Sequence, residues 1–557
     1  AKSTATQTVP ASPDWNLELE AKVYNGSTLI STLVAKPQDL LKQQIAQGKG
    51  VRLNGAVATE YTVVAPLKDS ATNAEHPHLT ARLHTRLYEG GARIRTDMVL
   101  ENNWTYKANP GNITYELTVR RNGQVVHTQP RFTHNHHARW HKVLWTGSTD
   151  PQVRLRHNMP YFLASRATWN YDLSLKVPES VLAEEARTLA ASNTAPMGPA
   201  MLQTYFPTTG SRWDIGPVPR WTALYLVTQD DRARASMMAN ADAAAGVPVH
   251  YRDEKTDHPV SLDSYPTIST LYGTSSPALP KPTGTTVWEP DTAHQASFAY
   301  IPYLVSGDAF YLDEMMFWSS WNIAAVDPYF RKDGQGLVRW DQLRGQAWVM
   351  RSIWEAQAAL PDTHAMKAYF KTKLAANLTD YATYFKAGNT ATSPLGPMTT
   401  ELTMDGQAAP WQNDFMAIVL SLMAENGETQ AKSALDWISP FTVGRYNKES
   451  EGFCAAKAPG YYWYVKDTAG KFITSWSALF ARNYPSAVGQ SCNNMPILTE
   501  AYPDCADCYA ANSRAMMGAS ANAGVANAAA TYTRWKALTP KLDAAFAVDP
   551  NWAIVPR

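Results

Sequence analysis

The sequence predicts a chain of two structural parts, an antiparallel β sandwich or barrel followed by an (α/α) toroid of about five to six helical hairpins. Short segments in which apolar and polar residues alternate recur between residues 15 and 177, and this period of two is typical of strands. From residue 178 to residue 557 the apolar residues recur at helical spacing. Residues 1–14 are expected to form a flexible N-terminus.

Strands are predicted most clearly at residues 17–24, 79–84 and 114–119, where the alternation is regular. Asn122 and Gly123 separate two such runs, and Asn-Gly is the preferred pair for a two-residue hairpin turn. Repeated short strands with turn residues between them favour an antiparallel sandwich or barrel.

One helical hairpin occurs twice in the second part. Tyr-Leu-Val, an Asp and Met-Met stand at matching positions of residues 225–238 and 303–316. The break before each second helix reads as an αα-hairpin turn. A repeated hairpin is typical of helical arrays and toroids, in which each unit buries its apolar face against the next.

Charge and composition exclude some classes of partner. The 50 Lys and Arg residues balance 49 Asp and Glu residues, so no overall basic footprint for nucleic acid is present. No apolar run reaches the roughly 20 residues that a membrane-spanning helix needs. The 19 Trp and 27 Tyr residues suit a polysaccharide or oligosaccharide partner, because flat rings stack on the apolar faces of sugars. The sequence leaves the oligomeric state open.

Four cysteines lie in the last fifth of the chain, at Cys454, Cys492, Cys505 and Cys508. An even, clustered set predicts two disulfides and an oxidising compartment. The chain begins at Ala1, as a processed N-terminus would. We therefore expect a secreted or periplasmic protein. The alternative is a divalent metal held by Cys505 and Cys508, whose spacing resembles half of a zinc knuckle.

A second candidate metal site lies in the β part. His134 and His136 would share one strand face, as two ligands of a metal do. The simpler interpretation, which we favour, is a solvated or interdomain face that carries polar residues. No metal or cofactor is otherwise predicted.

Several helices of the second part are preceded by a Trp and an Asp close together. Each Asp can be interpreted as a helix N-cap. In a toroid, however, alternate helices point the same way, so their N-termini would gather on one rim and form a shared site. The residues expected to bind a sugar there, with loop residues that could join them, are Trp213, Asp214, His250, Arg252, Trp288, Trp340, Trp411 and Tyr484.

One chemistry that suits such a rim is β-elimination from a uronate. A lyase needs a base for the proton α to the carboxylate and cationic or amide groups that neutralise the carboxylate. His294 or Tyr303 would be the base, and Arg344 with Asn413 would neutralise the uronate.

Two other functions remain open. An inverting hydrolase would need two carboxylates, for which Asp291 and Asp414 are the candidates; Asp341 stands at a matching position before a third helix. A glycan-binding or surface-assembly protein would use the same aromatic rim without catalysis.

The layout also resembles a known enzyme family. The segments that carry the resemblance are residues 76–83, 93–95, 132–145, 207–221 and 291–294 onward. In them the chain is similar to polysaccharide lyases that have an N-terminal β domain and an (α/α) toroid, and in particular to the exo-rhamnogalacturonan lyase-like group. The resemblance implies a carbohydrate-active enzyme more securely than it implies elimination.

Overall fold

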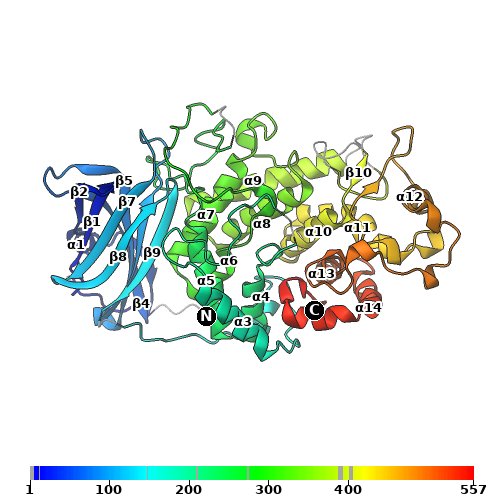
Figure 1. The fold of residues 1–557 in the computed structure, drawn as a ribbon, viewed down its shortest axis with the longest axis horizontal. Helices are drawn as coiled ribbons and strands as arrows, with labels where there is room; N and C mark the ends of the chain where they lie inside the picture. The colour runs from blue at the N-terminus through cyan, green and yellow to red at the C-terminus, as the bar shows by residue number, and fades with distance from the viewer. Residues whose placement is uncertain are drawn as a thin grey trace.

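The computed structural model describes residues 5–11, 13–146, 149–208, 211–271, 275–386, 393–399 and 406–557. The β domain and the helical region lie side by side, and the helical region extends away from the sheet toward α12 (Figure 1). The predicted flexible N-terminus falls in part on residues 1–4 and 12, outside the described residues. Of the rest, Gln7 is held, because its Nε2 donates to the carbonyl of Leu87.

The N-terminal part is one antiparallel sheet of nine strands, which confirms the predicted β domain. The strands are β1 Leu17–Asn25, β2 Thr28–Ala35, β3 Val51–Asn54, β4 Ala58–Asp69, β5 Glu75–Tyr88, β6 Arg93–Asn102, β7 Ile113–Arg121, β8 Gln124–His134 and β9 Ala138–Trp145, with helix α1 (Gln38–Gln47) after β2. The order is β8-β7-β1-β2-β4-β5-β6-β9, with β3 on β4. The sheet curls into a nearly closed barrel.

Alternating apolar side chains of the strands form the core of the barrel. Along β1, Leu17, Leu19, Ala21 and Val23 are buried while the residues between them are partly exposed, as the period of two requires. The predicted hairpin turn joins β7 to β8. Asn122 and Gly123 have φ angles of 50° and 78°, the positive values that the favoured two-residue turn demands.

The described chain after β9 is mainly helical. Its helices are α2 Met159–Ala164, α3 Glu179–Ala191, α4 Arg220–Thr228, α5 Asp231–Ala244, α6 Tyr300–Ser306, α7 Ala309–Ala324, α8 Leu343–Ala359, α9 Ala365–Tyr381, α10 Pro410–Glu425, α11 Thr429–Thr442, α12 Trp476–Asn483, α13 Tyr509–Asn522, α14 Ala528–Leu538 and α15 Lys541–Val548; a short strand pair joins β10 (Gln407–Ala408) and β11 (Trp463–Tyr464). None of the helices described combines the length and apolarity needed to cross a membrane.

The predicted hairpin repeat is present as α4–α5 and α6–α7. Each first helix ends at a left-handed residue, Gln229 or Gly307, and each second helix follows an Asp. The two Asp residues make different contacts. Asp230 caps α5 by accepting from the N–H of Arg232, whereas Asp308 makes no capping bond and pairs with arginines of the β domain.

Helical hairpins α8–α9, α10–α11 and α13–α14 follow, and the first helices of neighbouring hairpins pack together: α6 on α8, α8 on α10, and α10 on α13. Both α4 and α13 contact the short helix η11 (Pro550–Trp552) near the C-terminus. These contacts link the first helices of the hairpins in one series, from α6 through α8 and α10 to α13.

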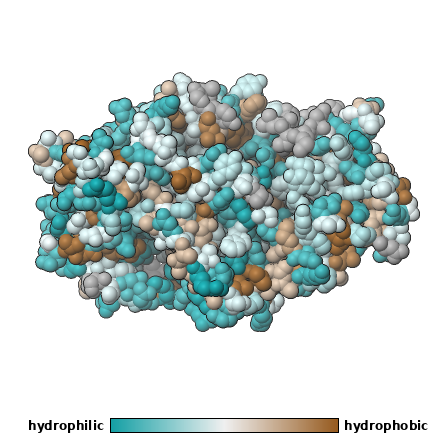
Figure 2. Space-filling view, in the orientation of Figure 1, coloured by the Kyte–Doolittle hydropathy of each residue, from teal (hydrophilic) through white to brown (hydrophobic). Residues whose placement is uncertain are grey.

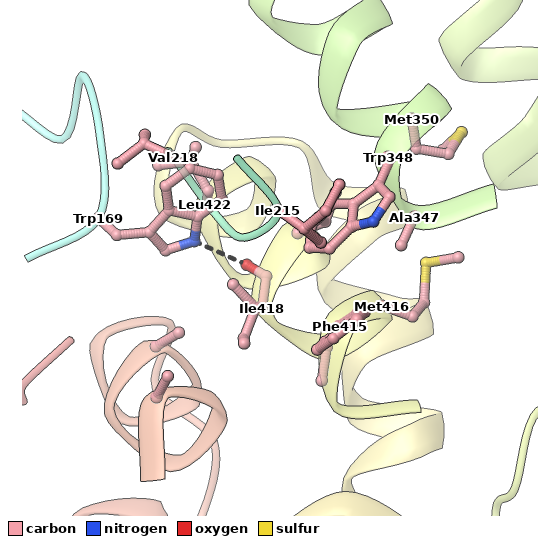
Figure 3. Close-up of a cluster of buried hydrophobic side chains, with 14 of the residues drawn as sticks. Trp169, Ile215, Val218, Ala347, Trp348, Met350, Phe415, Met416, Ile418 and Leu422 are labelled. Atoms are coloured by element: carbon pink, nitrogen blue, oxygen red, sulfur yellow. Dashed lines mark hydrogen bonds between the residues drawn. The ribbon is translucent and has the colours of Figure 1, made fainter. Parts of the chain in front are cut away.

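The helical core is aromatic and continuous. Figure 3 shows Trp169, from the segment after α2, donating its indole N–H to the carbonyl of Ile418 in α10 at 2.9 Å, with Trp348 and Phe415 close by. Met159 and Leu163 of α2 belong to the same core. The helical body therefore begins nearer residue 159 than the predicted boundary at residue 178.

Buried ion pairs join the two parts. Arg139 of β9 reaches Glu314 of α7 at 3.0 Å and Glu101 of β6 at 3.1 Å. Arg252 reaches Glu101 at 2.8 Å and Asp313 at 3.3 Å. Charges buried this deeply are tolerated only with close partners, so the network fixes the sheet against the helices.

Candidate functional site

A cluster of charged and aromatic side chains lies near the N-terminal ends of several helices. The loop before α4, the short helix η2 (Thr292–His294) before α6, and the first turns of α8, α10 and α13 all contribute to it. These segments are far apart in the sequence, and each lies at or before a helix N-terminus.

Asp291 and His294 form the most closely coupled pair of the cluster. Asp291 Oδ2 lies 2.5 Å from His294 Nδ1, and its Oδ1 accepts from the N–H of Ala293 at 2.6 Å. Burial acts to raise the pKa of Asp291. The hydrogen bond and charge of His294, with a smaller effect from the charge of Arg344, outweigh burial and lower that pKa. His294 is buried, and its Nε2 has no partner among the described residues.

Arg212 connects this pair to the loop before α4. Its Nε donates to Asp214 Oδ1 at 2.7 Å, and its Nη2 donates to the carbonyl of His294 at 3.1 Å. Burial raises the pKa of Asp214, and the charges of Arg212 and His294 oppose the rise. Asp214 Oδ2 is buried without a partner in the described part of the chain. The loop before α4 therefore fixes the backbone of His294 through Arg212.

Asp341 lies on the α8 side of the cluster. It accepts from Thr292 Oγ1 at 2.5 Å and from the N–H of Gln342 at 2.7 Å. Burial raises the pKa of Asp341 to about 6, and the neighbouring charge of Asp291 adds to the rise. Two neighbouring carboxyl groups thus have pKa values displaced in opposite directions, an arrangement typical of functional sites.

Arg344 lies between the carboxylates and an aromatic wall. Its Nε donates to Gln342 Oε1 at 3.1 Å, and its guanidinium carbon is 5.5 Å from the ring centre of Trp411. Burial lowers the pKa of Arg344 and the charge of Asp291 opposes this. Its two terminal nitrogens have no hydrogen-bond partner among the residues that the structure describes. They are therefore available to an anionic ligand.

The aromatic wall consists of Trp411, Tyr461, Tyr462 and Tyr509. Trp411 and Tyr461 stack at 6.1 Å with their planes 8° apart, and Tyr509 lies 5.8 Å from Trp411. Tyr461 is 47 % exposed, so the wall reaches the surface. Aromatic faces of this kind are the usual platform for a sugar ring.

The structure brings five of the residues predicted for the site into this cluster. They are Asp214, Asp291, His294, Arg344 and Trp411. Trp213 adjoins them on the exposed side, where Arg220 lies 4.7 Å from its ring centre.

Asp414 and Asn413 lie behind the cluster, in the core of α10. Asp414 forms a fully buried ion pair with Arg445 at 2.6 Å and accepts from Ser513 Oγ at 3.0 Å. Asn413 bonds to the backbone of Met398 and Ala409. The predicted roles of these two residues must be corrected, because neither side chain has a group free to meet a substrate.

His250 and Arg252 belong to the interdomain network instead of the rim. His250 Nε2 lies 2.8 Å from Glu314, and Arg252 pairs with Glu101 and Asp313. The sequence placed them in a loop before a helix, but that loop returns to the β domain, where the N–H of Arg252 bonds to Asn103.

Four further residues predicted for the site make packing or hydrogen-bond contacts outside the cluster. Trp288 is buried against Phe206. Trp340 packs on Phe330, outside the aromatic wall. The remaining two are Tyr303, packed against the helical core from α6, and Tyr484, whose hydroxyl bonds to Trp463 and the carbonyl of Lys457.

The cysteines form two disulfides, Cys454–Cys492 and Cys505–Cys508. This confirms the disulfide prediction and corrects the alternative metal site at Cys505 and Cys508, because both sulfurs are already bonded to each other.

The histidine alternative is also corrected. His134 is buried between Tyr115 and the carbonyl of Ala138, whereas His136 contacts His137. Strand β8 ends at His134, so the alternation that would have placed both histidines on one face does not continue.

The sequence analysis missed the three tyrosines of the wall. Tyr461 and Tyr462 stand in a Tyr-rich run of a long irregular loop, and Tyr509 is the first residue of α13. Loops of that length are often functional, but only the tertiary structure brings this one to Trp411.

Comparisons with protein-family models, with curated proteins and with solved structures find no match to this chain. Its function is therefore argued from the cluster itself. The cluster offers a histidine with one unpartnered nitrogen, an arginine with unpartnered donors, two unlike carboxyl groups and a partly exposed aromatic wall.

Proposed function

We propose that the cluster is the active site of a carbohydrate-active enzyme, a polysaccharide lyase that cleaves an acidic, uronate-containing polysaccharide by β-elimination. The observation that carries the proposal is the place of Arg344. Its guanidinium carbon lies 5.5 Å from the ring centre of Trp411, the charge of Asp291 acts on it, and its terminal nitrogens have no partner among the described residues.

The cluster offers both a group that can take a proton from the substrate and a group that can give one to the leaving oxygen. Asp291 accepts the Nδ1 proton of His294, which leaves the lone pair of Nε2 to take a proton. Arg344 would bind the uronate carboxylate and so acidify the carbon next to it. His294 would take the proton from that carbon, and the C–O bond β to the carboxylate would break as the double bond forms. Tyr461 would give its phenolic proton to the leaving oxygen.

We also propose that the helical region is an (α/α) toroid, as the sequence predicts. The packing of α6, α8, α10 and α13 in succession supports this, as does the contact of α4 and α13 with the same short helix. In such a scaffold every inner helix would present its N-terminus to one rim, which would explain why five separate segments supply the cluster. The two disulfides suit a secreted or periplasmic enzyme.

The test is digestion of a panel of acidic polysaccharides, followed by the ultraviolet absorbance of the conjugated, unsaturated uronate that only elimination makes. His294→Gln, Arg344→Gln and Tyr461→Phe should each lower turnover by about 10²- to 10⁴-fold, the usual contribution of a positioned proton-transfer or charge-stabilising group.

Matched controls separate chemistry from folding. His157→Gln and Arg187→Gln change the same residue types outside the cluster. Tyr464→Phe is the closest control for Tyr461→Phe, because both tyrosines are 47 % exposed. Turnover that survives in all three site variants, or falls equally in the controls, would contradict the proposed active site.

Inverting hydrolysis is the second candidate, and Asp341 favours it. Its raised pKa of about 6 suits a general acid, while the lowered pKa of Asp291 suits a general base. A hydrolase would release reducing ends without the new absorbance, and Asp341→Asn would abolish the release. Binding without any product would leave the third candidate, a glycan-binding protein.

A further inference from the structure

A large groove lies away from the candidate active site, where the β barrel fails to close. Strands β8 and β9 are consecutive in the chain yet lie at opposite ends of the strand order. The described residues form no ladder between them, so the outer edges of both strands face the gap. Side chains of the two strands interact electrostatically across this gap. Burial, and then the charge of Lys142 in β9, lower the pKa of His127 in β8.

The groove has a volume of about 1970 Å³ and runs from this gap to α5 and the α6–α7 turn. Sites for small molecules usually measure about 300–1,000 Å³. The groove is therefore large enough for several residues of a polymer.

Positive charge that is not neutralised collects in the groove. Eight Arg and Lys side chains line it, and five of them have a carboxylate partner. Arg131, Lys142 and Arg234 form no ion pair with any described carboxylate. They come from β8, β9 and α5, and the Arg131 guanidinium lies 3.4 Å from the ring centre of Tyr24.

Two stacked aromatic rings also line the groove. Tyr88 and Trp145 stack at 5.8 Å with their planes 19° apart, and both line the groove. The indole N–H of Trp145 has no hydrogen-bond partner among the described residues. A groove lined by stacked rings and by cations without an ion pair among the described residues suits a carboxylated sugar chain, whose rings stack while its carboxylates pair with the cations.

We propose that this groove binds a stretch of anionic polysaccharide and holds the polymer while the candidate active site acts on it. The identity of the ligand rests on the proposed function; the groove itself does not. Cleavage of a polymer would depend on the groove, whereas a disaccharide bound in the cluster alone would not.

The test measures binding of polygalacturonate fragments to full-length protein that carries His294→Ala, so that the chain is not cleaved. Arg131→Glu, Lys142→Glu and Arg234→Glu are introduced together. The matched control is Lys49→Glu, Lys371→Glu and Lys471→Glu, which changes the net charge equally at exposed lysines outside the groove. We expect the groove variant to bind at least about tenfold more weakly and the control to bind within about twofold of the parent, with Trp145→Ala also weakening binding.

Three outcomes would overturn the inference: equal loss in the control, no loss in the groove variant, or neutral dextran bound as tightly as polygalacturonate. Competition by poly-glutamate with no effect of Trp145→Ala would assign the groove to an acidic peptide and also overturn it. Failure of the proposed function is separate, since it appears as absent turnover by the protein with His294 intact, whatever the binding result.

Discussion

At the scale of single residues, one local pattern has four outcomes. Asp214, Asp291, Asp341 and Asp414 each follow a Trp closely and precede or begin a helix. Asp291 orients a histidine, Asp341 is partly buried with a raised pKa, Asp214 holds an arginine, and Asp414 neutralises a buried arginine. An Asp has the same intrinsic chemistry in all four places. Its role depends on which cation or N–H the fold brings to it.

Gly345 of α8 illustrates how closely Asp341 is packed. A Cβ at this position would lie 2.6 Å from Asp341 Oδ2, well inside contact distance. Gly345→Ala should therefore push the carboxylate away from Thr292 and lower turnover by about 10- to 100-fold, since small misplacements in a site are costly. Steady-state kinetics of the purified variant checks this.

A double variant provides the control. In an Asp341→Ala background the clash is gone, and Gly345→Ala should raise the unfolding free energy by up to about 1 kcal/mol, because Ala favours a helix interior over Gly. If Gly345→Ala has the same effect with and without Asp341, the two residues are not coupled.

At the scale of elements, α10 shows that one helix can serve both site and core. Its first turn presents Trp411 to the aromatic wall, while Asp414 faces inward to Arg445.

Asp414→Asn would leave a buried guanidinium without its counter-charge and should cost about 3–5 kcal/mol of stability. Denaturant unfolding measures the loss. Turnover per folded molecule should stay within about threefold of the wild type, since Asp414 meets no substrate; a loss as large as that of His294→Gln would return Asp414 to the site.

The two disulfides should contribute unequally. Cys454–Cys492 closes a segment with a sequence separation of 38, and Cys505–Cys508 one of only 3. By loop entropy, removal of the first should cost about 4 kcal/mol and removal of the second about 2 kcal/mol. Thermal unfolding of the two Cys→Ser pairs gives the comparison. A larger loss from the second pair would show that it supports Tyr509 and the wall directly.

At the scale of the whole molecule, the surface in Figure 2 is mostly hydrophilic with scattered apolar patches, and the two parts are held together by charge. His141 of β9 lies between two carboxylates, Asp97 at 2.7 Å and Asp242 of α5 at 2.9 Å, and stacks on Phe310 of α7. Burial opposes its protonation, but the two carboxylates outweigh burial and raise the pKa of His141 to about 10.

This pKa predicts a pH dependence of stability. A group whose folded-state pKa is raised stabilises the fold fully below its unfolded pKa, near 6.5 for histidine, and that contribution is lost as the pH rises through the folded value. Wild-type protein should therefore exceed His141→Asn in unfolding temperature most at pH 6, and the difference should shrink toward pH 10. A difference that is constant over this range would show that His141 acts through packing alone.

The sequence by itself determined the elements. The period of two in the predicted strands, the Asn122–Gly123 turn, the repeated hairpin and the paired cysteines follow from local geometry and chain entropy, which a linear pattern records directly. It also predicted that helix N-termini would supply a site and named Asp291 by that rule, whereas His294 and Arg344 were named as polar groups of adjacent loops.

Only the tertiary structure decided which partner each polar residue meets. The four Asp residues of one linear pattern were divided between the cluster and the core, and Tyr461 reached Trp411 from a loop about 50 positions away in sequence. Burial and ion pairing depend on contacts between distant segments. No period or spacing encodes them, because the same Asp or Arg is compatible with water, with a buried counter-charge or with a substrate until the fold has chosen its neighbours.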